Sequence, residues 1–274
     1  MGKGSAMSDA RTALVTGSTR GLGEAAADAL AAAGCKVMLS GFGDAGEIER
    51  KRGALSERHG VAIGYHDADL ADAAQIEALV KTTEDTLGPV DILVNNAVIR
   101  YFHTAEDFPR AEWEHALAVN VTAPFHLIGR TLPGMRARNW GRIVNISSVM
   151  GLGGRSGRAD YITSKAGLIG MTRAIAAETR TVEQITCNAI CPGTILTPNT
   201  EIKIAELAAE EGLSDADARR TYLDRRNQPT DFIDPARIAR FIAHLCRDES
   251  FDITGAIIPI DSGRSATWLE PPMV

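Results

Sequence analysis

The sequence lacks the features that mark several large classes of protein. Among its 274 residues, 29 are Lys or Arg and 35 are Asp or Glu, and no long basic run is interleaved with aromatics. With a net charge of −6, nucleic acid is not an expected partner. No apolar run approaches the roughly 18–20 residues that span a bilayer. The polar start also lacks the apolar centre of a secretory signal. We therefore expect a cytoplasmic protein that does not bind membranes.

Patterns of disulfide and metal sites are missing as well. The cysteines at 35, 187, 191 and 246 are scattered, and no second Cys or His pair has zinc-like spacing. The six histidines show no H-x-x-x-H arrangement. We expect buried, reduced thiols and no metal.

What the sequence does contain is a regular alternation of short β-rich apolar runs with Ala-rich stretches. Strands are predicted at 12–16, 36–40, 61–66, 91–95, 142–147, 185–190 and 256–259. Helices are predicted at 24–33, 47–59, 73–87, 113–138 and 161–179. This order is typical of an α/β fold, a parallel sheet with helices on both faces.

We expect one domain over residues 11–274, after a disordered tail or cloning remnant at 1–10. Pro124 is expected to bend the long helix at 113–138. The charged, helix-prone segment 198–234 breaks the alternation, and we interpret it as a helical lid over a pocket at the carboxyl edge of the sheet.

A glycine-rich turn joins the first predicted strand to the first helix. Gly17, Gly21 and Gly23 permit a tight turn and place the helix N-terminus against a phosphate. Their G-x-x-x-G-x-G spacing differs from the G-x-G-x-x-G fingerprint. Such turns are common, so the position between the first strand and the first helix carries the prediction of a dinucleotide site.

Polar residues follow three other predicted strands. Asp69-Leu70, Asn96-Ala97 and Pro192-Gly193-Thr194 all fall at the carboxyl edge, where ligands of such sheets bind. Ordinary turn chemistry is the alternative explanation for each. Cys191 has no evident base partner that would make it a nucleophile.

Tyr161 and Lys165 lie four residues apart and therefore share one helical face. An ammonium beside a phenol favours the phenolate, which suits proton exchange in alcohol–ketone chemistry. The alternative is an amphipathic helix with a core-edge Tyr and a solvated Lys. Asn120 is a poor helix former inside a predicted helix. It either shapes a bulge or holds a water, or is an ordinary solvent-facing Asn.

In order along the chain, T-G-x-x-x-G-x-G, N-N-A, the helix Asn, the Ser, Y-x-x-x-K and P-G resemble the short-chain dehydrogenase/reductase family. The resemblance runs from residue 11 to 263. It implies a Rossmann-type doubly wound sheet, a homotetramer, and an oxidoreductase that transfers a hydride between a nicotinamide cofactor and a secondary alcohol or ketone. It also implies a catalytic tetrad of Asn120, Ser148, Tyr161 and Lys165.

Each tetrad member has an implied role. Tyr161 exchanges a proton with the substrate oxygen, and Ser148 hydrogen-bonds that oxygen as charge develops. Ser148 is preferred over Ser147 because its interval to Tyr161 matches the family. Lys165 lowers the pKa of the tyrosine and binds the nicotinamide ribose, and Asn120 positions a water linking Lys165 to solvent.

The resemblance also implies which residues hold the cofactor. They are Gly17, Thr19, Arg20, Gly21, Leu22, Gly23, Phe42, Asp69, Leu70, Asn96, Ala97, Tyr161, Lys165, Pro192, Gly193, Ile195 and Thr197. The usual ribose-binding acid is replaced by Gly41, and Arg20 suits a 2′-phosphate, which favours NADP. The segment 40–44 is similar to NAD enzymes of the family and places Phe42 beside the adenine. We predict NAD, with NADP as the alternative.

Within the family, several segments resemble bacterial D-3-hydroxybutyrate dehydrogenases, but the positions that line the substrate pocket depart from them. Arg100 replaces a Gln, Met150 a His, Arg158 a Lys, Thr194 a Trp, Lys203 a Gln and Arg264 a Trp. With Ser148 and Tyr161, these form the predicted substrate-binding set. The added cations suit a carboxylate or another oxyanion, although a lone exposed Arg often binds no ligand.

The sequence thus predicts an oxidoreductase for a polar or anionic, hydroxy acid-like substrate other than 3-hydroxybutyrate. One alternative is an NADP-linked carbonyl reductase. Another is a non-catalytic dinucleotide-binding regulatory protein, which the intact tetrad argues against.

Overall fold

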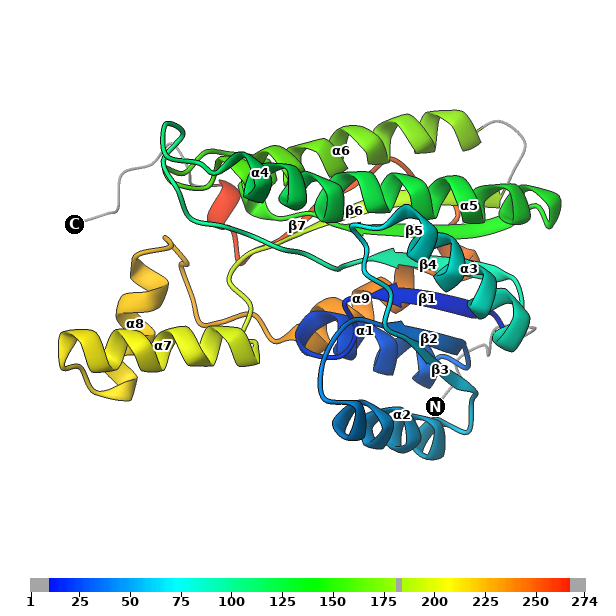
Figure 1. Ribbon diagram of the computed structural model, residues 1–274, viewed down its shortest axis with the longest axis horizontal. Helices are drawn as coiled ribbons and strands as arrows, with labels where there is room; N and C mark the ends of the chain where they lie inside the picture. Colours follow the sequence, from blue (N-terminus) through cyan, green and yellow to red (C-terminus); the bar gives the residue numbers. More distant parts are fainter. Residues whose placement is uncertain (1–9, 181–183, 267–274) are drawn as a thin grey trace.

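The computed structural model describes residues 10–180 and 184–266 (Figure 1). The tail or remnant expected at 1–10 lies outside the described residues except for Ala10. One seven-stranded sheet, with the order β3-β2-β1-β4-β5-β6-β7, forms the centre of the fold. All its neighbouring strands are parallel. The order reverses between β1 and β4, which confirms the expected doubly wound, Rossmann-type fold.

The elements follow the predicted alternation closely. The strands are β1 (Thr12–Thr16), β2 (Lys36–Ser40), β3 (Ile63–His66), β4 (Val90–Asn95), β5 (Trp140–Ile146), β6 (Gln184–Pro192) and β7 (Ile257–Ile260). The helices are α1 (Gly21–Ala32), α2 (Ala45–His59), α3 (Ala73–Leu87), α4 (Arg110–Leu117), α5 (Ala123–Ala137), α6 (Ala159–Thr179), α7 (Pro198–Glu211), α8 (Asp215–Asp224) and α9 (Pro235–Leu245).

The period-two alternation of the strands builds a core on each face of the sheet. Ala13 and Val15 of β1 pack in the cluster that includes α1 and α9, whereas Leu14 packs with α3, α5 and α6. Figure 1 shows α5 and α6 along the top of the view, whereas α1 and α9 lie together at the height of β1 and β2. Burying a side chain such as Leu14 contributes about 1.5–3 kcal/mol, so the two apolar faces fix the strand register.

The long helix predicted at 113–138 is present as an unbroken helical run over residues 110–137, with a π turn just before Pro124. The segment consists of α4, a π-helical turn at Ala118–Thr122, and α5. Asn120, inside the π turn, exchanges two hydrogen bonds with the backbone of Ile99, at 2.9 and 2.8 Å. Pro124 lies in the first turn of α5, directly after the π turn.

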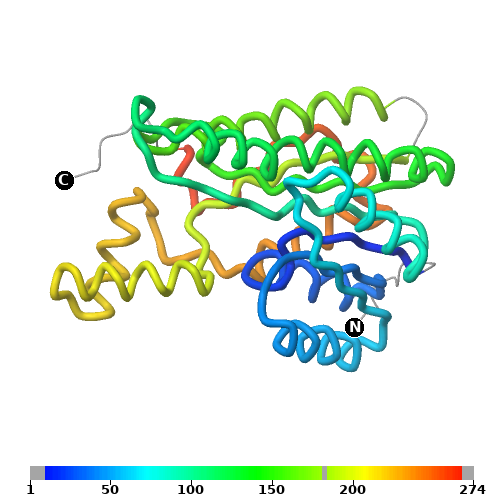
Figure 2. The backbone as a smooth tube through the Cα atoms, viewed as in Figure 1, coloured from blue at the N-terminus to red at the C-terminus, as the bar shows by residue number. Residues whose placement is uncertain are grey.

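The insert, residues 198–234, folds around a small core of its own. Thr197 and Ser214 cap α7 and α8, and Gly212 ends α7 in the left-handed conformation at φ 65°. The apolar contacts between the two helices come from Ile204, Leu207, Ala218 and Tyr222. The insert begins and ends close together, because Ile195 and Ile233 form a parallel β-bridge (Figure 2).

All four cysteines are free and buried, as expected. Burial raises the pKa of Cys35 and of Cys187 to about 12, and it also raises the pKa of Cys191. These thiols are therefore protonated at neutral pH and poor nucleophiles. None of the described helices is both long and apolar enough to cross a membrane.

Candidate active site

A cavity of about 1070 Å³ opens at the carboxyl edge of the sheet. Its walls come from the turn after β1, the segments that follow β4, β5 and β6, the start of α6 and the insert. Every residue of the predicted cofactor and substrate sets lines it except Gly23, and of the tetrad only Asn120 lies behind the wall. Residues far apart in the sequence thus converge on one site.

The glycine turn is shaped for close backbone approach. Gly17 and Gly21 have φ values of 63° and 62°, in the left-handed region. A Cβ on Gly17 would lie 2.8 Å from Ala97 Cα, and one on Gly23 would lie 2.2 Å from the Gly17 carbonyl oxygen. Gly23 therefore does not line the cavity, but its lack of a side chain lets the first turn of α1 pack directly against the glycine turn.

The N-terminus of α1 is open to a ligand, because no described side chain caps it. Its first N–H groups and the helix dipole suit a phosphate. Asn96 stabilises the turn, since its Nδ2 donates to the carbonyl oxygens of Thr16 and Gly17, at 2.9 and 3.0 Å. The arrangement fits the pyrophosphate of a dinucleotide.

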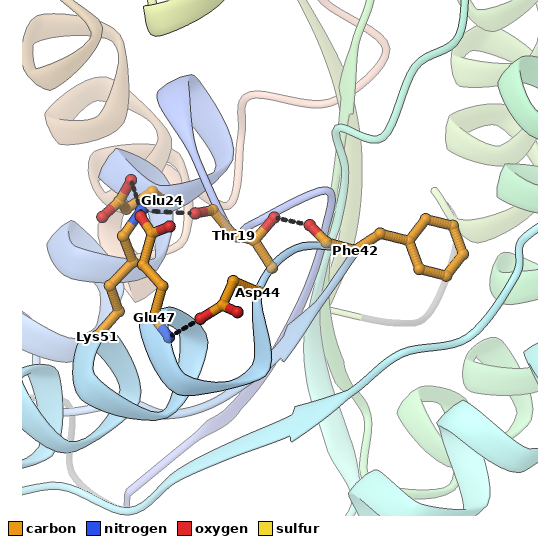
Figure 3. A network of polar contacts seen from close by, with 6 residues as sticks. All are labelled: Thr19, Glu24, Phe42, Asp44, Glu47 and Lys51. Atoms are coloured by element: carbon orange, nitrogen blue, oxygen red, sulfur yellow. Dashed lines mark hydrogen bonds and ion pairs between the residues drawn. The ribbon is translucent and has the colours of Figure 1, made fainter.

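The end of the cavity near β2 carries an ion-paired network (Figure 3). Lys51 Nζ donates to the Thr19 carbonyl oxygen at 2.9 Å and lies 3.3 Å from carboxylates of both Glu24 and Glu47. Thr19 Oγ1 donates to the Phe42 carbonyl oxygen at 3.0 Å, and the Phe42 ring points away from the network and is 65% exposed. An exposed ring on the cavity wall suits a flat adenine.

Lys165 is buried at the base of the cavity. Its ammonium donates to the Ile146 carbonyl oxygen at 2.6 Å, and Nζ lies 5.6 Å from the centroid of the Tyr161 ring. Burial, and secondarily the charge of Arg100, lowers the pKa of Lys165 to about 7. The ammonium is thus held beside the phenol ring, as the helical spacing predicts.

The two neighbouring serines differ in what their hydroxyls contact. Ser147 donates to the Lys165 carbonyl oxygen at 2.8 Å, so its hydroxyl hydrogen is already used in a hydrogen bond to α6. Ser148 Oγ accepts from the Met150 N–H at 3.1 Å, which leaves its own O–H available to a ligand. This contrast supports the choice of Ser148 as the substrate-facing serine.

Asn120 connects the segment after β4 with α6. Besides its two bonds to Ile99, its Nδ2 donates to Ser164 Oγ at 3.2 Å. The side chain therefore braces the catalytic helix from behind. The water-positioning role implied by the resemblance stays a prediction.

Cations gather along the substrate half of the cavity. The Arg158 guanidinium carbon lies 4.1 Å from the Phe102 centroid and 4.8 Å from the Tyr161 centroid. Arg100 lies 6.0 Å from Tyr161, and Lys203 Nζ lies 4.6 Å from Phe102. Burial, followed by the neighbouring cation Arg100, lowers the pKa of Arg158 and of Lys203.

Among the wall residues that sequence reasoning missed are Phe102, Arg155 and Arg226. The Arg-rich end of α8 and the glycine-rich loop before α6 were the available signals. Neither segment indicates by itself which arginine faces the site. Elsewhere within residues 10–180 and 184–266, no three His, Cys, Asp or Glu side chains gather as metal ligands would.

Comparisons with known proteins agree with this geometry. A family model described as short chain dehydrogenase matches residues 11–207. The chain is 37% identical over 257 residues to the D-beta-hydroxybutyrate dehydrogenase of Cupriavidus necator, across 94% of this chain and 98% of that protein. It is 36% identical to the acetoacetyl-CoA reductase of Shinella zoogloeoides, across 93% and 98%. The L-sorbose reductase of Gluconobacter frateurii, solved with NADPH and L-sorbose, has a TM-score of 0.88 at 27% identity, across 94% and 97%.

Proposed function

This chain belongs to the short-chain dehydrogenase family and is an oxidoreductase acting on hydroxyl or keto groups, and from that premise we propose that it interconverts an anionic hydroxy acid with the corresponding keto acid. The observation that carries the proposal is the group of cations facing Tyr161. Arg100, Arg158 and Lys203 line the cavity, and within the described chain no carboxylate lies at ion-pair distance from them.

The bound nicotinamide supplies the hydride acceptor or donor. Tyr161 removes the hydroxyl proton at its phenolic oxygen in oxidation and returns it in reduction. Ser148 donates its O–H to the same substrate oxygen, which stabilises developing negative charge. Lys165, whose pKa of about 7 lets it carry charge near neutrality, stabilises negative charge as it develops on the Tyr161 oxygen during proton transfer. Asn120 holds α6 in place.

Arg158 is the best-placed partner for a substrate carboxylate. Phe102 and Tyr161 flank its guanidinium, and its buried Nε has no hydrogen-bond partner among the described residues. An unmade hydrogen bond of a buried donor costs about 1–3 kcal/mol. A carboxylate beside Arg158 would satisfy that donor and place the adjacent carbinol near Tyr161.

We expect Arg158→Gln to raise KM for hydroxy acids about tenfold or more, because a hydrogen bond to a charged group contributes about 1.5–3 kcal/mol. Steady-state kinetics on hydroxy acids and on neutral secondary alcohols of matched length measures this. Wild type should prefer the acids, and the variant should lose most of that preference. Arg110→Gln is the control, since Arg110 is exposed and pairs with Glu114. Wild-type preference for the neutral alcohols would overturn the proposal.

We propose NAD as the dinucleotide. The support is electrostatic, because Lys51, the lysine beside the Thr19 turn, is already neutralised by Glu24 and Glu47. A 2′-phosphate would meet those carboxylates with Arg20 as its main cation. NADP is the alternative, since the sorbose reductase neighbour was solved with NADPH.

Wild type is expected to show a higher kcat/KM with NAD than with NADP. Glu47→Gln should narrow that ratio, because it removes one of the two carboxylates that neutralise Lys51. Glu49→Gln on the same helix is the control, since Glu49 pairs with Arg52 instead. Parallel initial rates with both dinucleotides provide the measurement. A wild-type preference for NADP would contradict the assignment.

We also propose a cytoplasmic homotetramer. The four free, buried thiols are compatible with a reducing compartment. Phe125 on α5 is 57% exposed and offers an apolar contact to another subunit.

A further inference from the structure

Three arginines that the proposed reaction does not use line the cavity beyond the cations near Tyr161. Arg155 lies in the loop before α6, Arg226 follows α8, and Arg264 follows β7. We call these three the outer arginines. Only Arg264 was expected at the site from the sequence, where it was grouped with the residues near Tyr161.

The outer arginines form one electrostatic group. Burial lowers the pKa of Arg264, and the charge of Arg155 lowers it further. Burial also lowers the pKa of Arg226, and the positive charges of Arg155 and Arg264 lower it further. Arg226 is thus disfavoured by both other arginines and Arg264 by Arg155, and all three line the same cavity, so their positive charges face a shared space.

Arg226 is held in position rather than free to swing outward. Its Nη1 donates to the Tyr222 carbonyl oxygen at 2.9 Å, and its guanidinium carbon lies 3.3 Å from the centroid of the Tyr222 ring. Tyr222 belongs to the core of the insert and is 7% exposed. The geometry leaves the other guanidinium donors for the cavity.

The carboxylates of the insert pair with different arginines. Glu211 contacts Arg225 at 2.8 Å, and Glu201 contacts Arg219 at 2.5 Å. For Arg155 and Arg226, the described chain provides no carboxylate at ion-pair distance. Asp261 stabilises the charge of Arg264, and its oxygens also accept the N–H groups of Gly263 and Ser265. The charges of Arg155 and Arg226 are therefore the ones that no carboxylate of the described chain compensates.

A substrate with a single carboxylate beside Arg158 would leave the positive charges of Arg155 and Arg226 without an anionic partner. We propose that the substrate carries a second anionic group, a carboxylate or a phosphate, which binds between Arg155, Arg226 and Arg264 while the carbinol lies at Tyr161. This inference rests on the proposed function, and it makes the substrate a dianion such as a hydroxy dicarboxylate or a phosphorylated hydroxy acid. Guanidinium forks suit both groups through paired N–H donors.

Calorimetric titration of the NADH-bound enzyme tests the proposal with unreactive probes. Glutarate and 3-phosphonopropanoate carry two anionic groups, whereas pentanoate is a monoanion of similar length. The dianions should bind about tenfold or more tightly than pentanoate, given about 1.5–3 kcal/mol for a charge-assisted hydrogen bond. Whichever dianion binds more tightly identifies the second group as carboxylate or phosphate.

Arg155→Gln should bring the affinity of the dianions down towards that of pentanoate. Arg155 is exposed, so this substitution is compatible with folding. Arg226→Gln is a second variant with the same expected result, and Arg155→Lys should restore part of the difference. Arg225→Gln is the matched control, because Arg225 is the next residue along the chain but pairs with Glu211 and does not line the cavity.

Two negative results have different meanings. Equal binding of pentanoate and the dianions, with binding of all three lost in Arg158→Gln, would overturn the second anionic group and leave the proposed function standing. Binding of none of the three probes would overturn the anionic substrate itself, and the second group with it.

Discussion

Replacing Tyr161 by Phe is expected to lower kcat by about a hundredfold to ten-thousandfold, the usual contribution of a positioned acid or base. The substitution removes only the phenolic hydroxyl. The ring that packs against Arg158 and lies near Lys165 is kept. The KM for the dinucleotide should therefore change little. Steady-state kinetics gives kcat, and titration of the protein with NADH, followed by nucleotide fluorescence, gives the affinity.

Tyr101→Phe is the matched control for this substitution. Tyr101 also loses a hydroxyl, one that contacts His115 Nδ1 at 2.9 Å, but it is not part of the cavity wall. Its kcat should stay close to that of wild type. Substantial turnover by Tyr161→Phe would exclude the proposed proton transfer, whereas equal losses in both variants would indicate a general structural effect.

Replacing Lys165 by Met is expected to shift the pH dependence of both activity and stability. The substitution removes the ammonium that lies 5.6 Å from the centroid of the Tyr161 ring, so activity at neutral pH should fall, and the part of the pH dependence that comes from titration of Lys165 near pH 7 should disappear. The pH–rate profile of kcat over the range that the protein tolerates measures this. An unchanged profile would contradict the role proposed for Lys165.

The stability effect has an unusual sign. Below pH 7 the lysine is charged in the folded and unfolded chains, so the whole cost of burying the charge is present. Above pH 7 the folded form loses its proton first, and the unfolded form then binds more protons. The contribution of Lys165 to the unfolding free energy of the wild type therefore becomes more favourable between about pH 7 and about pH 10, by at most about 5 kcal/mol.

Urea unfolding of the cofactor-free enzyme at several pH values tests this linkage. The advantage in unfolding free energy of Lys165→Met over wild type should shrink as pH rises through that window. Lys81→Met is the control, because Lys81 is exposed and Asp85 raises its pKa. A difference between Lys165→Met and wild type that does not vary with pH would show that Lys165 stays protonated in the folded chain.

The fold and the centre of the site were predictable because they depend on local patterns. Alternating periodicity located the strands of the sheet, and parallel strands necessarily bring their carboxyl ends to one edge. The glycine turn after β1 and the Tyr161–Lys165 spacing then fall at that edge without any knowledge of long-range contacts. The family resemblance added Ser148 and Asn120, whose roles no local pattern specifies.

Long-range contacts were not predictable in the same way. Asn120, in the π turn, bonds through its side chain to Ile99, a partner 21 residues away. Asn96 lines the cavity, yet its side-chain amide donates to the backbone of the glycine turn. Arg155 and Arg226 face one space only after the insert packs beside the sheet. An Arg-rich helix end has the same sequence pattern whether it faces a cavity or solvent.

The small core of the insert also has a consequence for local stability. Because Ile204, Leu207, Ala218 and Tyr222 pack mainly with one another, α7 and α8 should open as one cooperative unit with a lower unfolding free energy than the sheet. Backbone amides across the two helices would then exchange hydrogen together. Lys203 and Arg226 belong to that unit, so a substrate bound by them and by Arg158 would couple local unfolding of the insert to occupancy of the site.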